Sequence, residues 1–252
     1  MRLGYLSVAA PGGAPNEDFV LAGEDFVLVL DGATRSAPET GCRHDVAWVT
    51  RRLGLRLGQL LVEQPELTLT AALRAAIERV RALHADTCEL DHPDSPSATV
   101  AVVRERAGRL EHLVLCDSPV LIELTDGRLV VVHDDRVDRL PAYDLATVAR
   151  LRNTPGGFWV ASTRPEAADQ ALTGAHPSAE VARFAVLSDG VSRLVERYGW
   201  SWRQLLDTLA RQGPGGAVRA VRAAELAAGP GDGRGKRHDD ATVAFGYPGP
   251  GV

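Results

Sequence analysis

The order of strand-like and helix-like segments constrains the fold of this chain more than any other feature of the sequence. Short apolar runs come first, two long amphipathic stretches follow, and a series of β-rich segments leads to further helices and a last strand. The predicted strands are residues 3–8, 19–22, 26–30, 99–103, 110–115, 120–123, 129–132, 158–161, 183–187 and 241–245. The predicted helices are residues 39–62, 68–88, 141–152, 191–198, 202–212 and 217–227. Because strands and helices are segregated and do not alternate, we expect an α+β fold with antiparallel sheets.

The composition is that of a globular protein, with 45% hydrophobic and 24% charged residues. Its 252 residues are enough for a buried core, and we expect a single domain over residues 1–252. A net charge of -5 argues against nucleic acid or an anionic membrane as the main partner. The first apolar run is too short for a signal peptide, and no apolar stretch reaches the roughly 18 residues of a membrane span. We therefore expect a cytoplasmic protein without a membrane partner.

The three cysteines, Cys42, Cys88 and Cys116, are odd in number and show no Cys-x-x-Cys spacing. This pattern predicts neither a disulfide framework nor a zinc cluster, and it suits a reducing compartment. The seven histidines are scattered, without a His-Glu-x-x-His motif or other paired ligand spacing. A zinc enzyme is therefore not expected.

Carboxylates stand at the ends of five predicted strands. They are Asp31 before Gly32, Asp189 before Gly190, Asp117 after strand 110–115, Asp239 and Asp240 before the last strand, and Glu17 and Asp18 before strand 19–22. If these strands lie side by side, the acids converge and repel one another, and a hard divalent cation relieves that repulsion. The alternative for any single Asp-Gly is an ordinary turn, which is our interpretation of Asp126-Gly127. The set as a whole favours a site for magnesium, manganese or calcium.

These acids belong to short motifs whose order along the chain resembles that of the metal-dependent, type-2C serine/threonine protein phosphatases. The motifs are Asn16-Glu17-Asp18, Val29-Leu30-Asp31-Gly32, Pro96-Ser97-Ala98-Thr99, Cys116-Asp117-Ser118, Leu187-Ser188-Asp189-Gly190 and Asp239-Asp240-Ala241-Thr242-Val243. Each is weak alone, but the ordered set spans nearly the whole chain. The resemblance implies a divergent bacterial signalling phosphatase. Its fold would be two antiparallel β-sheets packed as a sandwich and flanked by pairs of antiparallel helices.

The resemblance also implies roles for individual residues. Asp31 would bridge two Mn²⁺ or Mg²⁺ ions, Gly32 would offer its carbonyl, and Asp189 and Asp239 would complete the shell of the second ion. Glu17 would hold a metal-bound water. Asp117 together with Asp189 resembles a third metal site found in bacterial members. Asp18 and Asp240 would support these ligands.

The implied reaction needs no side-chain nucleophile. Two divalent ions lower the pKa of a bound water, and the resulting hydroxide attacks the phosphorus of a phosphate monoester in line. The Asp31, Asp189 and Asp239 ligands would therefore be the catalytic residues. His238, beside Asp239, is a candidate general acid or substrate-binding group, with a loop histidine in a polar cluster as the alternative.

The departures from the family pattern concern phosphate binding. Bacterial members usually carry an arginine where this chain has Gly13, and Asp31-Gly32 continues as Ala33-Thr34-Arg35. Arg35 is a candidate replacement for the missing arginine, and a solvated surface charge is the alternative. Residues 139–174, which include Phe158 and Trp159, correspond to the variable flap of the family and are expected to shape substrate entry.

Three functions remain open from the sequence. The first is a monomeric phosphatase acting on phosphoserine or phosphothreonine in proteins. The second uses the same metal centre on a small-molecule phosphate, which the altered arginine pattern motivates. The third is a catalytically weak module that binds phosphorylated partner proteins, which the loss of the arginine at Gly13 motivates.

Overall fold

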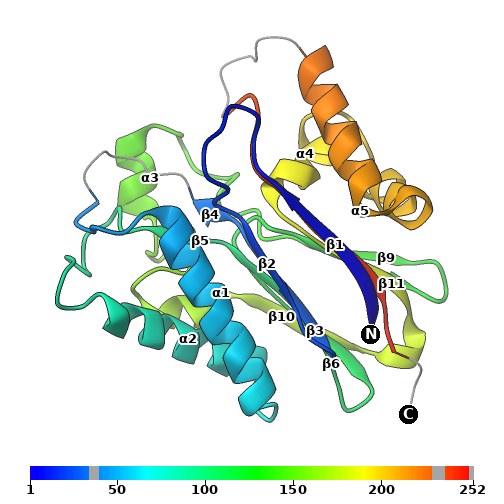
Figure 1. Ribbon diagram of the computed structural model, residues 1–252, viewed down its shortest axis with the longest axis horizontal. Helices are drawn as coiled ribbons and strands as arrows, with labels where there is room; N and C mark the ends of the chain where they lie inside the picture. Colours follow the sequence, from blue (N-terminus) through cyan, green and yellow to red (C-terminus); the bar gives the residue numbers. More distant parts are fainter. Residues whose placement is uncertain (34–39, 229–235, 250–252) are drawn as a thin grey trace.

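The computed structural model describes residues 1–33, 40–228 and 236–249, and they form two five-stranded antiparallel sheets (Figure 1). The first sheet has the order β1 (Arg2–Val8), β12 (Ala241–Tyr247), β11 (Val181–Leu187), β8 (Val120–Leu124) and β9 (Leu129–Val132). The second has the order β10 (Leu172–Pro177), β7 (Arg109–Leu115), β6 (Val100–Arg106), β3 (Phe26–Leu30) and β2 (Phe19–Ala22). A two-stranded ribbon pairs β4 (Gly32–Ala33) with β5 (Ser97–Ala98).

The two sheets pack face to face, and each carries a pair of helices on its outer face (Figure 1). The continuous apolar run of β3 is explained by this layering. Val27 and Val29 point into the core between the sheets, whereas Phe26, Leu28 and Leu30 point into the core under the helices. A strand buried on both faces has no polar face to alternate with. The predicted α+β sandwich is therefore confirmed.

Helices α1 (Val46–Glu63) and α2 (Leu69–Leu83) cover the second sheet. The backbone N–H of Trp48 donates to the Asp45 side chain at the start of α1, and that of Ala71 donates to Thr68 at the start of α2. These caps satisfy amides that have no partner within the helix. The predicted bounds of 39–62 and 68–88 were too wide, because the caps at Asp45 and Thr68 set the starts and α2 ends at Leu83.

Helices α4 (Asp189–Glu196) and α5 (Trp202–Ala227) cover the first sheet. The two helices predicted at 202–212 and 217–227 run together as α5, with a kink at Gly213, whose φ of 68° and ψ of -178° are not helical. Pro214 follows, where a missing N–H is tolerated at the start of a new helical segment. The interruption was predicted correctly, although the flanking segments are longer than expected.

The segment predicted as a flap contains α3 (Leu145–Leu151) and the 3₁₀ turn η1 (Pro165–Gln170) before it enters β10. A second 3₁₀ turn, η2 (Ser178–Glu180), connects β10 to β11. The strand predicted at 158–161 is wrong, since Phe158 and Ala161 make only isolated bridges to Arg152 and Ala98. The bridge to Ala98 attaches the flap to β5, next to Gly32 on β4.

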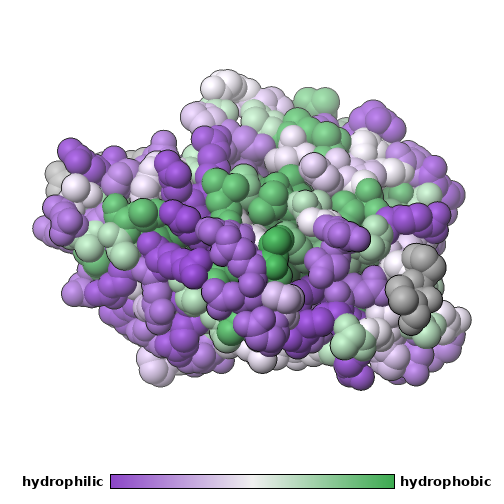
Figure 2. Space-filling view, turned by 60° about the horizontal axis from the view of Figure 1, so that its bottom comes forward, coloured by the Kyte–Doolittle hydropathy of each residue, from purple (hydrophilic) through white to green (hydrophobic). Residues whose placement is uncertain are grey.

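Hydrophilic residues cover most of the face in Figure 2, and they separate smaller apolar patches. Within the described part of the chain, no helix has both the length and the apolar character needed to cross a bilayer.

Candidate metal centre

The predicted acidic residues gather at one end of the sandwich, where strands from both sheets finish. Asp31 links β3 to β4, Asp189 is the first residue of α4 directly after β11, and Asp239 comes shortly before β12. The backbone N–H of Asp189 donates to Oδ2 of Asp31 over 3.1 Å, which joins the two sheets at this point. Gly32 is packed so tightly that a Cβ there would lie 2.6 Å from Val46 and 2.7 Å from the Glu17 side chain.

Repulsion among the carboxylates is strong. Burial raises the pKa of Asp31 well above its usual value, and the charges of Asp189, Asp18, Asp239 and Asp117 raise it further. The pKa of Asp189 is raised by burial and then by Asp239. Each group therefore resists ionisation until a positive charge joins the cluster.

Asp18 and Asp117 lie at the edges of this cluster. Asp18 is 6% exposed, and its Oδ2 is buried with no hydrogen-bond partner among the described residues. Burial raises its pKa to about 7. The pKa of Asp117 is also raised to about 7, by burial and then by the charge of Asp189. A buried carboxylate oxygen without a donor fits a site that receives a cation.

Arg193 supplies one positive charge that the sequence analysis missed. Its Nη2 donates to Asp239 Oδ2 over 2.8 Å and lies 3.9 Å from Asp189 Oδ1. Its Nη1 contacts Glu225 of α5 at 3.3 Å. The signal in the sequence was the arginine four residues after Asp189, one helical turn along α4.

The Asp240 side chain binds backbone amides. Its two carboxylate oxygens accept from the N–H of Ala10 and the N–H of Glu17, each over 2.7 Å. These bonds hold the segment before β2 against the start of β12. A Cβ at Gly190 would lie 1.7 Å from the carbonyl oxygen of Asp240, so only glycine fits at that position of α4.

The predicted substrate-binding residues have different outcomes. Arg35 lies outside the described residues. His238 binds Glu225 through Nδ1 over 2.7 Å, within a polar cluster that includes Arg222. The Nζ of Lys236 lies 3.4 Å from Asp239 Oδ1. Burial lowers the pKa of Lys236, but the charges of Asp239 and Glu17 outweigh this and raise it above its usual value. Lys236 is thus a cation beside the acidic cluster.

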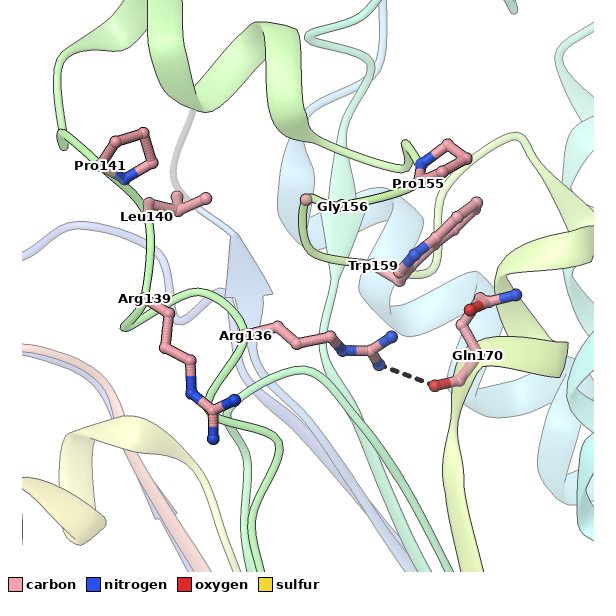
Figure 3. Close-up of a pocket in the computed structure, with 9 residues that line it drawn as sticks. Arg136, Arg139, Leu140, Pro141, Pro155, Gly156, Trp159 and Gln170 are labelled. Carbon is pink, nitrogen blue, oxygen red and sulfur yellow. Dashed lines mark hydrogen bonds between the residues drawn. The ribbon is translucent and has the colours of Figure 1, made fainter.

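A cavity of about 490 Å³ opens in the flap (Figure 3). Leu140 and Pro141 lie on one side of it, and Pro155 and Trp159 lie on the other. Arg136 extends between them and donates to the carbonyl of Gln170 over 2.7 Å.

Two hydrogen-bonded steps connect this cavity to the acidic cluster. Arg136 pairs with the buried carboxylate of Asp134 over 2.6 Å. Asp134 in turn accepts from the backbone N–H of Cys116 over 3.1 Å, next to Asp117. The cavity therefore lies within reach of the same end of the sandwich.

One group of donor atoms is not among the predicted acids. This group consists of Cys42, His44, His84 and Cys88, and each places one donor atom within 4.8 Å of the other three. Among the described residues, it is the group of three or more His, Cys, Asp or Glu side chains that meets this distance. The sequence analysis did not anticipate that Cys42 and Cys88 lie close to each other and to two histidines. The signal was the pair of short spacings, Cys-x-His and His-x-x-x-Cys, which the antiparallel α1 and α2 bring together. Within the described ranges, the carboxylates of the acidic cluster do not bring three oxygens within this distance of one another.

Comparisons with known proteins agree with the fold. A family model described as Protein phosphatase 2C matches residues 9–227. A search of curated proteins finds no significant match.

Among solved structures, the serine/threonine phosphatase PstP/Ppp of Mycobacterium tuberculosis superposes with a TM-score of 0.65 at 19% identity, over 98% of this chain and 97% of that chain. The catalytic domain of PstP in complex with 2 manganese ions gives a TM-score of 0.62 at 20% identity, over 98% and 97%. The PPM Ser-Thr phosphatase MsPP from Mycobacterium smegmatis, in complex with cacodylate, gives 0.63 at 17% identity, over 99% of both chains. At such identities these structures establish a common fold.

The family model covers most of the chain, and the motifs that resemble the family converge at one end of the sandwich. The chain belongs to the protein phosphatase 2C family and is a metal-dependent protein phosphatase.

Proposed function

We propose that this protein dephosphorylates phosphoserine and phosphothreonine in proteins, using two Mn²⁺ or Mg²⁺ ions at the acidic cluster. The observation that carries the proposal is the convergence of Asp31, Asp189 and Asp239, whose mutual repulsion a divalent ion relieves. Asp31 and the Gly32 carbonyl would hold one ion together with Glu17, through water. Asp189 and Asp239 would complete the ligand shell of the second ion, and Asp117 with Asp189 would form a third site.

When bound, such ions supply Lewis acidity and an activated water for in-line attack on phosphorus. The residues of this chain keep the ligands in place. Asp240 positions Glu17 through its backbone N–H, and Arg193 orients Asp239. His238 is held by Glu225, so its Nε2 is the nitrogen that remains for a leaving oxygen.

Phosphate recognition would depend on cations other than the usual arginine. Lys236 supports this role because its ammonium group lies at the edge of the acidic cluster. Arg35 is a second candidate from the sequence. The flap cavity, with Trp159 and two arginines, supports a substrate that extends beyond its phosphate, as a phosphorylated peptide does. This favours a protein substrate over a small phosphate ester.

The test is hydrolysis of p-nitrophenyl phosphate and of a phosphothreonine peptide, with and without manganese. Asp239→Asn should abolish the metal-dependent turnover, whereas Asp126→Asn should not, because Asp126 lies in the exposed turn between β8 and β9. A far higher kcat/KM for a small phosphorylated metabolite than for the peptide would show that the protein is a small-molecule phosphatase. Phosphoprotein binding without any turnover would establish the binding module and refute the proposal.

A further inference from the structure

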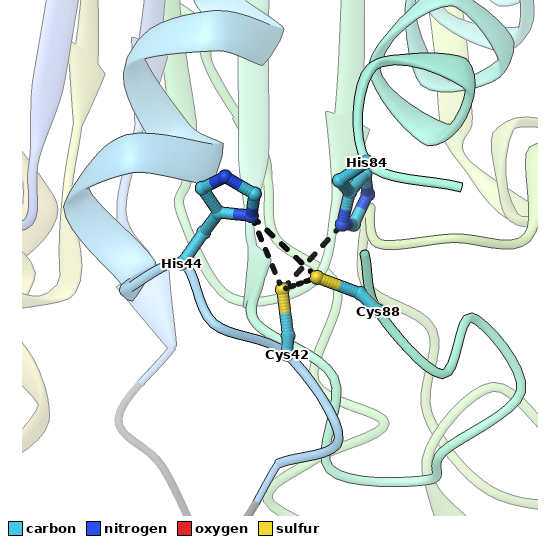
Figure 4. Close-up of side chains that lie close together, drawn as sticks. All are labelled: Cys42, His44, His84 and Cys88. Atoms are coloured by element: carbon cyan, nitrogen blue, oxygen red, sulfur yellow. Dashed lines mark hydrogen bonds between the residues drawn. The ribbon is translucent and has the colours of Figure 1, made fainter. Parts of the chain in front are cut away.

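Four metal-binding side chains meet where α1 begins and α2 ends (Figure 4). Cys42 and His44 lie just before the cap of α1 at Asp45. His84 is the residue that closes α2, and Cys88 lies in the turns that follow. The helices are antiparallel neighbours, which brings the two pairs together from distant parts of the sequence (Figure 4).

The distances between these atoms match the edges of a tetrahedron around one ion. Cys42 Sγ lies 3.6 Å from His44 Nδ1 and 3.4 Å from His84 Nδ1, and Cys88 Sγ lies 3.5 Å from His44 Nδ1. A tetrahedral zinc with bonds of about 2.3 Å to sulfur and about 2.0 Å to nitrogen separates a sulfur from a nitrogen by about 3.5 Å. The donors therefore already surround a position that an ion can fill.

The two sulfur atoms are the exception. They are 2.9 Å apart, which is longer than the about 2.05 Å of a disulfide bond. It is also shorter than the about 3.8 Å expected of two thiolates on one zinc. Both cysteines are free here and lie within hydrogen-bond distance of each other. So close a pair can close to a disulfide or bind one metal ion, and the experiments below distinguish these states.

We propose that Cys42, His44, His84 and Cys88 bind one structural zinc ion. Two thiolates and two imidazoles suit zinc and not the hard ions expected at the acidic cluster. All four ligands come from the protein, so the site has no open position for catalysis. His84 is 3% exposed, and Trp48 stacks on the His44 ring with centroids 3.9 Å apart, which shields the site from water.

The position of the site gives the ion a structural task. It joins Cys42 and His44, just before α1, to His84 and Cys88 at the end of α2, and β5 follows Cys88 in the sequence. The N–H of Glu89 donates to the Gly41 carbonyl over 2.7 Å beside it. The ion would therefore fasten both chain segments that flank the β4–β5 pair, on which Gly32 lies.

The first experiment measures the metal content of protein purified reduced, without a metal-binding tag. We expect one zinc per chain in the wild type and its loss in Cys88→Ser and in His84→Asn. Cys116→Ala is the matched control, since this buried cysteine lies outside the cluster, and it should keep the zinc. Asp239→Asn should also keep it, which separates this site from the phosphatase centre whether or not the enzyme turns over.

Two further measurements do not depend on the folding of any variant of the four proposed zinc ligands. Cobalt added to the reduced, metal-free protein should give the intense visible bands of a tetrahedral site with thiolate ligands. Removing zinc from Asp239→Asn protein should lower Tm by about 5 °C or more.

Three results would overturn the proposal. The first is reduced protein that holds no zinc and takes up neither zinc nor cobalt. The second is a Cys42–Cys88 disulfide in protein from a reducing compartment, detected as the loss of two titratable thiols after denaturation. The third is iron and inorganic sulfide in place of zinc.

Discussion

Arg193 and Asp239 form an ion pair of 2.8 Å, and the arginine side chain is only 1% exposed. The same guanidinium contacts Asp189 and Glu225, so one buried cation is surrounded by three carboxylates. Two of these are expected metal ligands. The arginine therefore offsets part of the negative charge that would otherwise accumulate before any metal binds.

Replacing Arg193 with methionine should reveal this compensation. Removal of one partner from a buried ion pair costs about 3 to 5 kcal/mol, because the remaining charges are left without a counterion. Urea unfolding of Arg193→Met should show this loss in the absence of metal, and a smaller loss in saturating manganese. An equal loss in both conditions would mean that the arginine acts only by packing.

Asp31→Asn should have opposite effects on stability and activity. A carboxyl group whose pKa is raised in the folded state destabilises the fold at neutral pH, where it is ionised in the unfolded chain. The neutral amide removes this repulsion, so the Tm of the metal-free protein should rise by about 2 °C or more. Turnover with manganese should fall by about 100-fold or more. A lower Tm in the variant would contradict the repulsion argument.

Lys236→Ala should weaken phosphate recognition. A charge-assisted hydrogen bond to phosphate contributes about 1.5 to 3 kcal/mol, so kcat/KM for a phosphopeptide should fall by about 10- to 100-fold. Lys236→Arg should recover most of the loss, since it restores the charge at the same place. Unchanged kinetics in Lys236→Ala would assign phosphate binding to another cation.

Gly190→Ala should destabilise the protein and disturb the metal centre. A Cβ at this position would lie 1.7 Å from the Asp240 carbonyl, and backbone must move to relieve the contact at a cost of about 3 kcal/mol. Gly215→Ala, in α5, is the control. There the nearest atom is 3.3 Å away at the end of the flexible Arg219 side chain, and the substitution should stabilise α5 by up to about 1 kcal/mol. Chemical denaturation of both variants measures the difference.

His112 should make the protein less stable in acid. Burial, and then the charge of His176, lowers the pKa of His112 to about 4, whereas the unfolded value is about 6.5. The unfolded state therefore binds the proton first. The stability present above pH 6.5 decreases as the pH falls toward 4, by about 2 to 3 kcal/mol.

His112→Leu should flatten the unfolding free energy across this pH range. His176→Gln should keep most of the slope, because it removes the neighbouring charge and leaves His112 buried. If the unfolding free energy of His112→Leu still fell with pH as steeply as that of the wild type, the acid sensitivity would belong to other groups.

The sequence predicted the elements whose local signals agree with their environment in the fold. Residues 19–22 and 26–30 were predicted with the bounds of β2 and β3, because apolar side chains fill both strands. β10 was missed because it is a half-exposed edge strand that includes Gly174 and Pro177, so its side chains give no strand pattern. Its extended conformation comes from backbone pairing with β7.

The acidic residues were predictable for a related reason. Each follows or precedes a strand, and strand ends meet when a sandwich closes. The spacing of Arg193 from Asp189 is a local signal, but the contact of Arg193 with Asp239 depends on which segments become neighbours. The same holds for Cys42 and Cys88. Each lies near a histidine in the sequence, and only the packing of α1 against α2 brings the two pairs together.

The pairing of β1 with β12 has a consequence for how this enzyme is made. Arg2 lies opposite Tyr247 and Val8 opposite Ala241, so the first strand leaves the ribosome long before its hydrogen-bonding neighbour is translated. Asp239 and Asp240 emerge just ahead of that neighbour. The acidic cluster therefore cannot assemble until the segment that carries Asp239 has been synthesised and β12 has inserted between β1 and β11.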